Sequence, residues 1–471
     1  MQAGQNKKRR ANARLSWDGV GKSAVGRGGL LNQNGLDDIS AGLFTIFVQC
    51  KTDLSALDFN ILCTGDIREH LSAVQLVLNS LLALSGVVRV QIGVAGNSVS
   101  KLVLVQLFDE IGINVLTFLT GIDNTGGEET GTVLYEKNAD QQMPIASITK
   151  VMTLLLTFEA VHNGQLTMDT PVPVSEHAYH MGGSQIWLEP GEQFTLDEMI
   201  KAICVSSAND AAVAVAELVG GSEQGFVQSM NARAAELGMT NTVFHNACGL
   251  DAEGHLSTAR DVAVMSRYIL NTCPEVLHYT GIWTDTLRGG ATQLVNTNKL
   301  LRRYNGITGL KTGTTSGAGV CISASATRDG LELIAVVLGA PSSSDRFDAA
   351  TTLLDYGFAA YRAVPLPAVE DQPLLIKVKG SAEESVPLDY SALPETLLMP
   401  KEGGAALTAR ADLPDALDAP VQQGQAVGTV RVLSGETLLG EYEIRAAADA
   451  PKMDFGTAFG LLWDALTGRD D

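Results

Sequence analysis

The chain has 471 residues, a length that normally divides into domains of about 100–200 residues each. Hydrophobic residues make up 45% of it and charged residues 18%, a composition that supports packed cores and excludes a wholly disordered chain. The formal net charge of −20 argues against a general nucleic-acid binder, because phosphate binding needs a positive surface. We therefore expect no nucleic-acid partner.

Residues 1–124 show no clear pattern of secondary structure. The basic residues near the start of the chain favour a solvated tail over a nucleic-acid-binding arm or the basic part of a signal sequence. A secretory signal would place an apolar segment directly behind the basic residues, but residues 15–40 are polar and rich in glycine. The first long uncharged run, Leu71–Val88, contains Gln75, Asn79 and serines, and it has the minimum length of a membrane helix.

We therefore expect residues 1–124 to be an unassigned N-terminal region, either non-native or disordered. An upstream frameshift or a misplaced start codon would produce such a sequence, because a wrong reading frame keeps no binary pattern. In that case the strand that follows would lack a partner along one edge. The alternative is a genuine extra domain in which Leu71–Val88 is an internal membrane anchor.

After the turn-like stretch at residues 124–131 the pattern becomes regular. The hydrophobic periodicity predicts a strand at Gly131–Asp140 and an amphipathic helix at Ser147–His162. Thr195 and Glu198 form a capping box that opens a helix running to about Val205. Further helices are predicted at Ala211–Val219, Ser222–Leu237, Thr258–Leu270 and Arg346–Phe358. Strands are predicted at Gly319–Thr327 and Leu331–Gly339, joined by the hairpin signal Asp329-Gly330.

The pattern turns all-β after Pro365. Short strands are predicted at Leu374–Val378, Thr396–Met399, Gly428–Leu433 and Leu438–Ile444, the last two joined at Ser434-Gly435. From Phe455 onward, apolar residues recur at helical spacing: Phe459, Leu462, Trp463 and Leu466. These changes divide the rest of the chain into segments 125–364, 365–450 and 451–471.

Cysteine and histidine spacing indicates no metal or redox site. None of the six cysteines forms a CxxC pair, and the seven histidines contain no HExxH motif. His177 and His180 have no cysteine nearby in the sequence. We therefore expect no metal and no cofactor.

Three short motifs occur in the order Ser147-Ile-Thr-Lys150, Ser207-Ala-Asn209 and Lys311-Thr-Gly313. This set is typical of the active-serine acyltransferases, which include penicillin-binding proteins and serine β-lactamases. A second SxxK match, Ser98-Val-Ser-Lys101, is rejected because only Ser147 opens a long helix and is followed by the other two motifs at suitable distances.

Acyl transfer to a serine needs the residue types that occur in these three motifs. An alcohol such as that of Ser147 attacks a carbonyl only when a base takes its proton, and Lys150 lies on the same helix face at i+3. Burial and the second cation, Lys311, would lower the pKa of Lys150 so that it can act as a neutral base. Ser207 can relay a proton to the leaving amine, and Asn209 can hold the substrate's peptide group.

The third motif supplies binding groups. Gly313 lets a strand approach the ligand backbone closely. The backbone N–H groups of Ser147 and Thr314 are the natural oxyanion hole.

At this point the sequence resembles the D-alanyl-D-alanine carboxypeptidases, the low-molecular-mass penicillin-binding proteins that trim peptidoglycan stem peptides. The resemblance covers about residues 126–465 and rests on the three motifs and on further segments: Thr130–Asp140, Pro144–Lys150, Pro190-Gly-Glu192, Ser207–Ala212, Gly249-Leu-Asp251 with Gly254-His255, and Gly309–Thr314. The middle motif of the family is usually SGN, so Ala208 is a mild departure.

The resemblance implies an α+β fold. Its catalytic domain is β-lactamase/DD-peptidase-like, with an antiparallel sheet flanked by helices plus a helical lobe, and a small all-β sandwich domain follows. It also implies an extracytoplasmic, membrane-associated enzyme that acts on the peptidoglycan pentapeptide and binds β-lactam antibiotics. The closing helix is similar to the family's peripheral membrane anchor. Its acidic residues weaken attraction to anionic lipid, so docking on the protein itself is an alternative.

Residue by residue, the resemblance implies that Ser147 is acylated and that Lys150 is its base. Ser207, Asn209 and Lys311 would complete the catalytic set. The substrate's terminal carboxylate would be received by Thr312 and Thr314 beside Gly313, with Arg303, which aligns only loosely, helping to neutralise it.

Two other functions remain open. A class A β-lactamase shares the first and third motifs, but the only faint candidate for its deacylating glutamate is Glu236, which lacks the accompanying asparagine. A penicillin or cell-wall sensor would be acylated without turnover, and the complete set of catalytic side chains argues against it.

Overall fold

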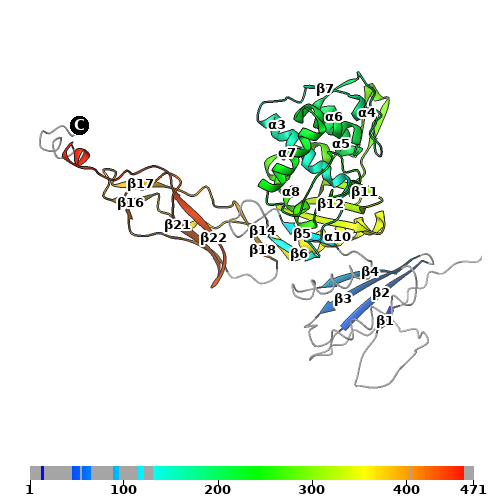
Figure 1. Cartoon of the computed structure of the whole chain (residues 1–471). Coiled ribbons are helices and arrows are strands. Elements are labelled where there is room, and N and C mark those ends of the chain that lie inside the picture. The colour runs from blue at the N-terminus through cyan, green and yellow to red at the C-terminus, as the bar shows by residue number, and fades with distance from the viewer. Residues whose placement is uncertain are drawn as a thin grey trace, which may run out of the picture. The chain divides into compact units, whose positions relative to one another are not determined.

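Figure 1 shows the computed structural model of the chain, which describes residues 12–14, 45–53, 56–64, 88–94, 115–120, 131–401 and 406–460. The chain divides into two compact units, Met1–Leu107 and Phe108–Asp471. Each unit contains sheet structure of its own.

The described part of the first unit is a four-stranded sheet with strand order β1-β2-β3-β4. Its strands are β1 (Asn12–Arg14), β2 (Thr45–Asp53), β3 (Ala56–Thr64) and β4 (Val88–Val94). Neighbours pair antiparallel except β3 and β4, which are parallel. The sequence pattern identified none of these strands. The run Leu71–Val88, apart from Val88 itself in β4, lies outside the described residues.

The second unit is built on a five-stranded antiparallel sheet with strand order β11-β12-β13-β5-β6. Its strands are β5 (Val115–Thr120), β6 (Val133–Lys137), β11 (Ile307–Thr315), β12 (Gly319–Arg328) and β13 (Leu331–Ala340). Asp329 and Gly330, between β12 and β13, both have positive φ, as a type I′ turn requires. The predicted hairpin is therefore confirmed.

Strand β5 corrects one expectation from the sequence. It lies between β13 and β6, and it pairs with Leu333–Leu338 on one side and with residues 133–137 on the other. The predicted strand Gly131–Asp140, observed as β6, therefore has the partner that was expected to be missing. The residues of β5 show no polar–apolar alternation, and a strand inside a sheet with both faces covered needs none.

Two helices cover this sheet, α8 (Ala259–Thr272) and α10 (Ser343–Ala360). Both pack on β12 and β13, whose central residues are buried without interruption, so both faces of the sheet are covered. Thr258 caps α8 by accepting a hydrogen bond from the Asp261 N–H, and Ser342 caps α10 in the same way.

A helical lobe lies between β6 and β11 in the chain. Its helices are η2 (Ala146–Thr149), α3 (Lys150–His162), α4 (Glu176–Tyr179), α5 (Leu196–Val205), α6 (Asn209–Gly220), α7 (Glu223–Glu236), α9 (Val276–Thr280), η3 (Arg288–Gly290) and η4 (Lys299–Arg302). Two small antiparallel two-stranded sheets lie among them: β7 (Pro171–Pro173) pairs with β8 (Gln193–Thr195) across α4, and β9 (Thr284–Leu287) pairs with β10 (Thr292–Val295).

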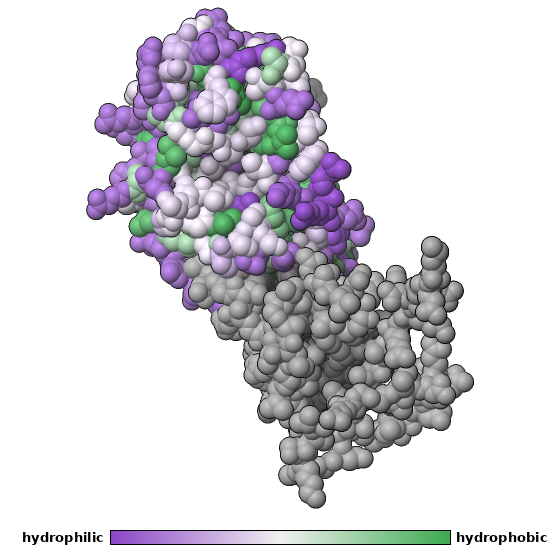
Figure 2. Space-filling view, turned by 90° about the vertical axis from the view of Figure 1, so that its right-hand side faces the viewer, coloured by the Kyte–Doolittle hydropathy of each residue, from purple (hydrophilic) through white to green (hydrophobic). Residues whose placement is uncertain are grey.

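The lobe's core is formed by the apolar faces of α3, α5 and α6. The predicted capping box of α5 is confirmed, because Thr195 and Glu198 exchange both of its hydrogen bonds. Figure 2 shows that the surface described in that view is mostly hydrophilic or intermediate, with apolar side chains in separate small areas.

The chain from residue 361 onward has a second hydrophobic core, built from all-β structure. The ribbon β14 (Tyr361–Pro365) with β18 (Thr396–Pro400) comes first, followed by a seven-stranded sheet of order β15-β19-β21-β22-β17-β16-β20. Its strands are β15 (Val369–Glu370), β16 (Leu375–Lys379), β17 (Ser385–Asp389), β19 (Leu407–Asp412), β20 (Leu417–Asp418), β21 (Ala426–Ser434) and β22 (Thr437–Ala446). The four strands predicted here are all present.

Residues 455–460 begin the predicted closing helix. Its remaining apolar positions, Leu462, Trp463 and Leu466, lie outside the described residues. None of the helices in the described ranges has both the length and the apolar character needed to cross a membrane.

Candidate active site

The first motif forms the turn that leads into α3. Ala146 has a φ of 48°, a left-handed conformation that bends the chain sharply just before Ser147. Lys150 begins α3 one helical turn later, and its Nζ lies 2.9 Å from Ser147 Oγ. The structure thus brings the predicted nucleophile and base into direct contact.

Lys150 is completely buried, and three acceptors surround its nitrogen. Nζ donates to Ser147 Oγ (2.9 Å), to Asn209 Oδ1 (2.6 Å) and to the backbone oxygen of Cys248 (2.6 Å). Burial lowers the pKa of Lys150 to about 8, because the charged form loses its hydration, and Asp210 partly opposes this shift. A neutral Lys150 keeps two donors for Asn209 and Cys248 and turns its lone pair toward the Ser147 hydroxyl.

The second and third motifs meet through another buried lysine. Lys311, on β11, donates to Ser207 Oγ (2.8 Å) and to the backbone oxygen of Thr312 (2.9 Å). Its pKa is held well below the ordinary value, mainly by burial and then by the positive charge of Lys150. Ser207 has a φ of 59°, so the backbone holds its side chain in a conformation that few non-glycine residues adopt.

Asn209 and Asp210 open α6 and fix the loop that faces it. Asn209 Nδ2 donates to the Gly182 carbonyl (2.6 Å), while its Oδ1 receives the bond from Lys150. Asp210 is fully buried and accepts hydrogen bonds from the backbone N–H groups of Ile186 and Leu188. Sequence reasoning missed Asp210, since an acidic residue in a helix's first turn is already explained by the helix dipole.

Two glycines allow the backbone around Ser147 to pack closely. A Cβ at Gly313 would lie 2.8 Å from the Ile145 carbonyl oxygen and 3.0 Å from the Ser147 nitrogen. A Cβ at Gly249, where φ is +82°, would lie 2.0 Å from the Ala146 carbonyl oxygen. Only glycine fits at either position, and as a result β11 and the loop 246–251 both lie directly against the Ala146–Ser147 backbone.

The loop 246–251 supports the site from behind Lys150. Asn246 Oδ1 accepts from the backbone N–H groups of Cys248, Gly249 and Leu250, which fixes the Cys248 carbonyl that Lys150 contacts. The loop's last residue, Asp251, accepts from Thr315 Oγ1 (2.6 Å), Ser316 Oγ (3.2 Å) and the Gly317 N–H (3.1 Å). These bonds join the loop to the turn that follows the third motif.

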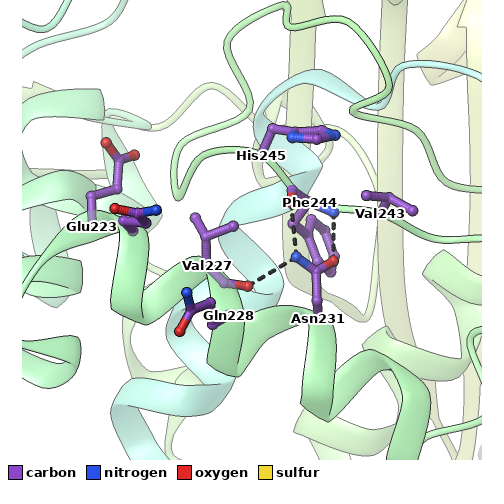
Figure 3. Close-up of a pocket in the computed structure, with 8 residues that line it drawn as sticks. Glu223, Val227, Gln228, Asn231, Val243, Phe244 and His245 are labelled. Atoms are coloured by element: carbon purple, nitrogen blue, oxygen red, sulfur yellow. Dashed lines mark hydrogen bonds between the residues drawn. The ribbon is translucent and has the colours of Figure 1, made fainter.

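Helix α7 is hydrogen-bonded to the residues that lead into the loop 246–251. Figure 3 shows Asn231 facing Phe244, with its Nδ2 donating to the Phe244 carbonyl (2.9 Å) and its Oδ1 accepting from the Phe244 N–H (2.8 Å). A pocket of about 460 Å³ lies between α7 and residues 243–245. None of the residues lining this pocket belongs to the three motifs.

His255 holds the turn between Ser147 and Lys150. Its Nδ1 accepts from the His245 N–H (3.2 Å), so the ring proton lies on Nε2, which donates to Thr149 Oγ1 (2.8 Å). Burial lowers the pKa of His255 to about 4, and the ring is therefore neutral at physiological pH.

A buried arginine that sequence reasoning missed lies beneath the third motif. Arg346 Nη1 donates to the carbonyl oxygens of Gly313 and Cys321 (3.0 Å each) and contacts Thr314 Oγ1 at 3.3 Å. Burial lowers its pKa to about 10, so it remains a cation at neutral pH. Its position in the first turn of α10, where a helix dipole disfavours a cation, was the available sequence signal.

The remaining predicted residues are placed as follows. Thr312 is buried, and its hydroxyl lies 2.6 Å from that of Thr297. Arg303 is exposed at the end of η4, and within the described ranges no hydrogen bond ties it to the motif residues. Glu236, the candidate for a lactamase-type glutamate, pairs with Arg233 on α7 instead. Ser98 and Lys101 lie outside the described residues.

Comparisons with known proteins agree with this geometry. Residues 127–342 match the family model described as D-alanyl-D-alanine carboxypeptidase, and residues 363–452 match the one described as penicillin-binding protein 5, C-terminal domain. The chain is 40% identical over 332 residues to the D-alanyl-D-alanine carboxypeptidase DacF of Bacillus subtilis (strain 168), covering 70% of this chain and 85% of that protein.

Another relative is also named as a D-alanyl-D-alanine carboxypeptidase, and a similar solved structure is a penicillin binding protein. The chain is 33% identical over 355 residues to the D-alanyl-D-alanine carboxypeptidase DacC of Escherichia coli (strain K12), covering 71% of this chain and 84% of DacC. Among solved structures, penicillin binding protein 5 from Haemophilus influenzae aligns with a TM-score of 0.63 at 27% identity, over 72% of this chain and 98% of that one.

Proposed function

The chain belongs to the D-alanyl-D-alanine carboxypeptidase family, and on that premise we propose how its residues carry out the reaction. The enzyme is a serine-type D-Ala-D-Ala carboxypeptidase of the penicillin-binding type. The observation that supports the residue assignment is the contact of Ser147 with a fully buried lysine whose other two acceptors come from the first residue of α6 and from the loop 246–251.

In the acylation step the Ser147 oxygen attacks the carbonyl carbon of the penultimate D-alanine. Neutral Lys150 takes the hydroxyl proton, which its low pKa and its 2.9 Å contact with Oγ both favour. The C–N bond then breaks, and the acyl group stays on Ser147 as an ester. Water attacks that ester in the second half of the cycle, and the shortened peptide is released.

The departing D-alanine needs a proton on its nitrogen. Ser207 is positioned to supply it, because its hydroxyl is hydrogen-bonded to Lys311 Nζ and can pass a proton between that group and the leaving amine. Asn209 holds Lys150 from the other side and can bind the substrate's peptide group.

Substrate binding is assigned to the free edge of β11, which is the terminal strand of its sheet. An extended peptide can add to such an edge through backbone hydrogen bonds, and the close approach at Gly313 brings its scissile carbonyl to Ser147. Thr312 and Thr314 are assigned to the terminal carboxylate, with the positive charge of Arg346 beneath them. Arg303 stays a prediction for the same carboxylate.

The natural substrate is proposed to be the pentapeptide of peptidoglycan, encountered outside the cytoplasm, and β-lactams are proposed to acylate Ser147. The match to the family's C-terminal domain supports this setting. Contact of the closing helix with a membrane is part of the proposal: the side chains of Phe455 and Phe459 at its start are 86% and 54% exposed.

The assignment is tested by turnover of a D-Ala-D-Ala peptide. The wild-type enzyme is expected to release D-alanine, Ser147→Ala is expected to release none, and Ser98→Ala is expected to match the wild type. D-alanine release by Ser147→Ala would refute the assignment. A β-lactamase would instead release hydrolysed penicillin rapidly, and a sensor would stall after acylation.

A further inference from the structure

Three potential metal ligands converge at the end of α3 opposite to the catalytic serine. His162 is the last residue of α3, Cys273 is the C-cap of α8, and Glu275 precedes α9. Their ligand atoms all lie within 4.8 Å of one another. In the described part of the chain, this is the one group of three such side chains that converges in this way.

We infer that His162, Cys273 and Glu275 form a binding site for one zinc-like divalent ion, with water as the fourth ligand. An imidazole nitrogen, a thiolate and a carboxylate are the donors that zinc accepts, whereas magnesium and calcium do not favour sulfur. The thiol gives up its proton to solvent as the sulfur–metal bond forms. The spacing of residues 162, 273 and 275 matches no metal motif, which is why no metal was expected from the sequence.

Only small side-chain movements would bring the three ligand atoms to the distances found around a tetrahedral zinc ion. Tetrahedral zinc with bonds of about 2.0–2.3 Å places its ligand atoms roughly 3.3–3.8 Å apart. His162 Nε2 and Glu275 Oε1 are 2.6 Å apart, so an ion must separate them slightly. Their side chains are 45% and 35% exposed and can rotate, while the buried Cys273 provides a fixed point.

The surrounding charges allow a cation to bind. Arg233 is the basic residue whose charge acts on Cys273, and it is already paired with Glu159 at 2.6 Å and with Glu236 at 2.7 Å. An ion in this place would tie the end of α3 to the junction of α8 and α9. Because Ser147 and Lys150 stand at the other end of α3, the ion would stabilise the helix that positions them.

Titration of the full-length, reduced enzyme with Co²⁺ tests the site. Cobalt replaces zinc in tetrahedral sites, and a cobalt–thiolate bond gives a sulfur-to-metal charge-transfer absorption. We expect one equivalent to bind to the wild type with this absorption, Cys273→Ser to lose the absorption, and added Zn²⁺ to displace the cobalt. An absent absorption in the wild type, or one retained in Cys273→Ser, would overturn the inference.

Two histidine variants keep the test valid if Cys273→Ser fails to fold. His162→Ala removes an exposed ligand and should weaken binding about tenfold or more, since even changes behind the direct ligands cost about 10–100-fold. His177→Ala is the matched control, because His177 pairs with Glu223 at 2.7 Å outside this group of three ligands. At a fixed Zn²⁺ concentration the melting temperature should rise equally in the wild type and His177→Ala, and by less in His162→Ala. Equal binding by all three proteins, or equal weakening in both variants, would contradict the site.

Discussion

At the scale of single residues, we propose that the burial of Lys150 sets how the acylation rate responds to pH. Lys150 acts as a base only when neutral, and its pKa of about 8 means that the neutral fraction grows mainly between pH 7 and 9. The rate of penicillin acylation should therefore rise over that range. His255 does not contribute to this rise, because its pKa is lowered to about 4.

Stopped-flow or quenched measurements of the second-order acylation constant against pH check this prediction. A rate that stays flat up to pH 9 and rises only near the ordinary lysine pKa of about 10.4 would contradict Lys150 as the base.

Gly313 provides a second test at the same scale. In Gly313→Ala the new methyl group would lie 3.0 Å from the Ser147 nitrogen, so β11 or the Ser147 turn must move. Misplacement of a reacting group by about 1 Å can cost about 100-fold in rate, and we expect a loss of that order in acylation. Gly460→Ala is the control, since a Cβ there meets none of the described residues within 4 Å. Equal acylation rates for the two variants would show that the close approach does not matter.

At the scale of elements, Asp251 connects the loop 246–251 with the turn after β11. Its carboxylate accepts three hydrogen bonds, each worth about 0.5–1.5 kcal/mol at most in this exposed position. Because Asp251 is exposed and water competes for these bonds, we expect less than their sum: Asp251→Ala should lower the free energy of unfolding, measured by urea denaturation, by about 1–3 kcal/mol. Asp348→Ala is the control, because among the described residues that carboxylate accepts one side-chain bond, from Ser344 at 3.2 Å.

The loss of stability in Asp251→Ala should depend on pH. The hydrogen bond from Thr315 is the main cause of the lowered pKa of Asp251, so the folded protein favours the charged carboxylate. The stabilisation of the folded protein by Asp251 is therefore fully present above the usual carboxyl pKa of about 4. It is lost as the pH falls through the lower pKa that Asp251 has in the folded protein. The difference between wild type and Asp251→Ala should shrink in acid; a difference that grows in acid would contradict this account.

Elements with local sequence signals could be predicted, whereas contacts between distant residues could not. Capping residues and the Asp329-Gly330 turn are local signals, and the helices and the hairpin that they predicted are present. The motif residues could be assigned because their spacing is distinctive. Arg346 and Thr297 were missed, because their partners, Gly313 and Thr312 respectively, lie in distant parts of the chain, and only Arg346 carried a local signal.

At the scale of the whole molecule, we propose that the catalytic part includes β5, because this strand lies inside its five-stranded sheet. A chain starting at Phe108 keeps β5 between β13 and β6, whereas a chain starting at Gly131 removes it and leaves two unpaired strand edges. We expect the first chain to be labelled by penicillin as the full chain is, and the second to aggregate or lose labelling. Equal labelling of both truncated proteins would show that β5 is dispensable.

The central claim is that Ser147 forms the acyl-enzyme, and peptide mapping by mass spectrometry after penicillin exposure tests it most directly. The account predicts one adduct for each chain, located on the peptide that contains Ser147. An adduct on any other peptide, such as the one containing Ser98, or no adduct on a folded enzyme, would contradict it.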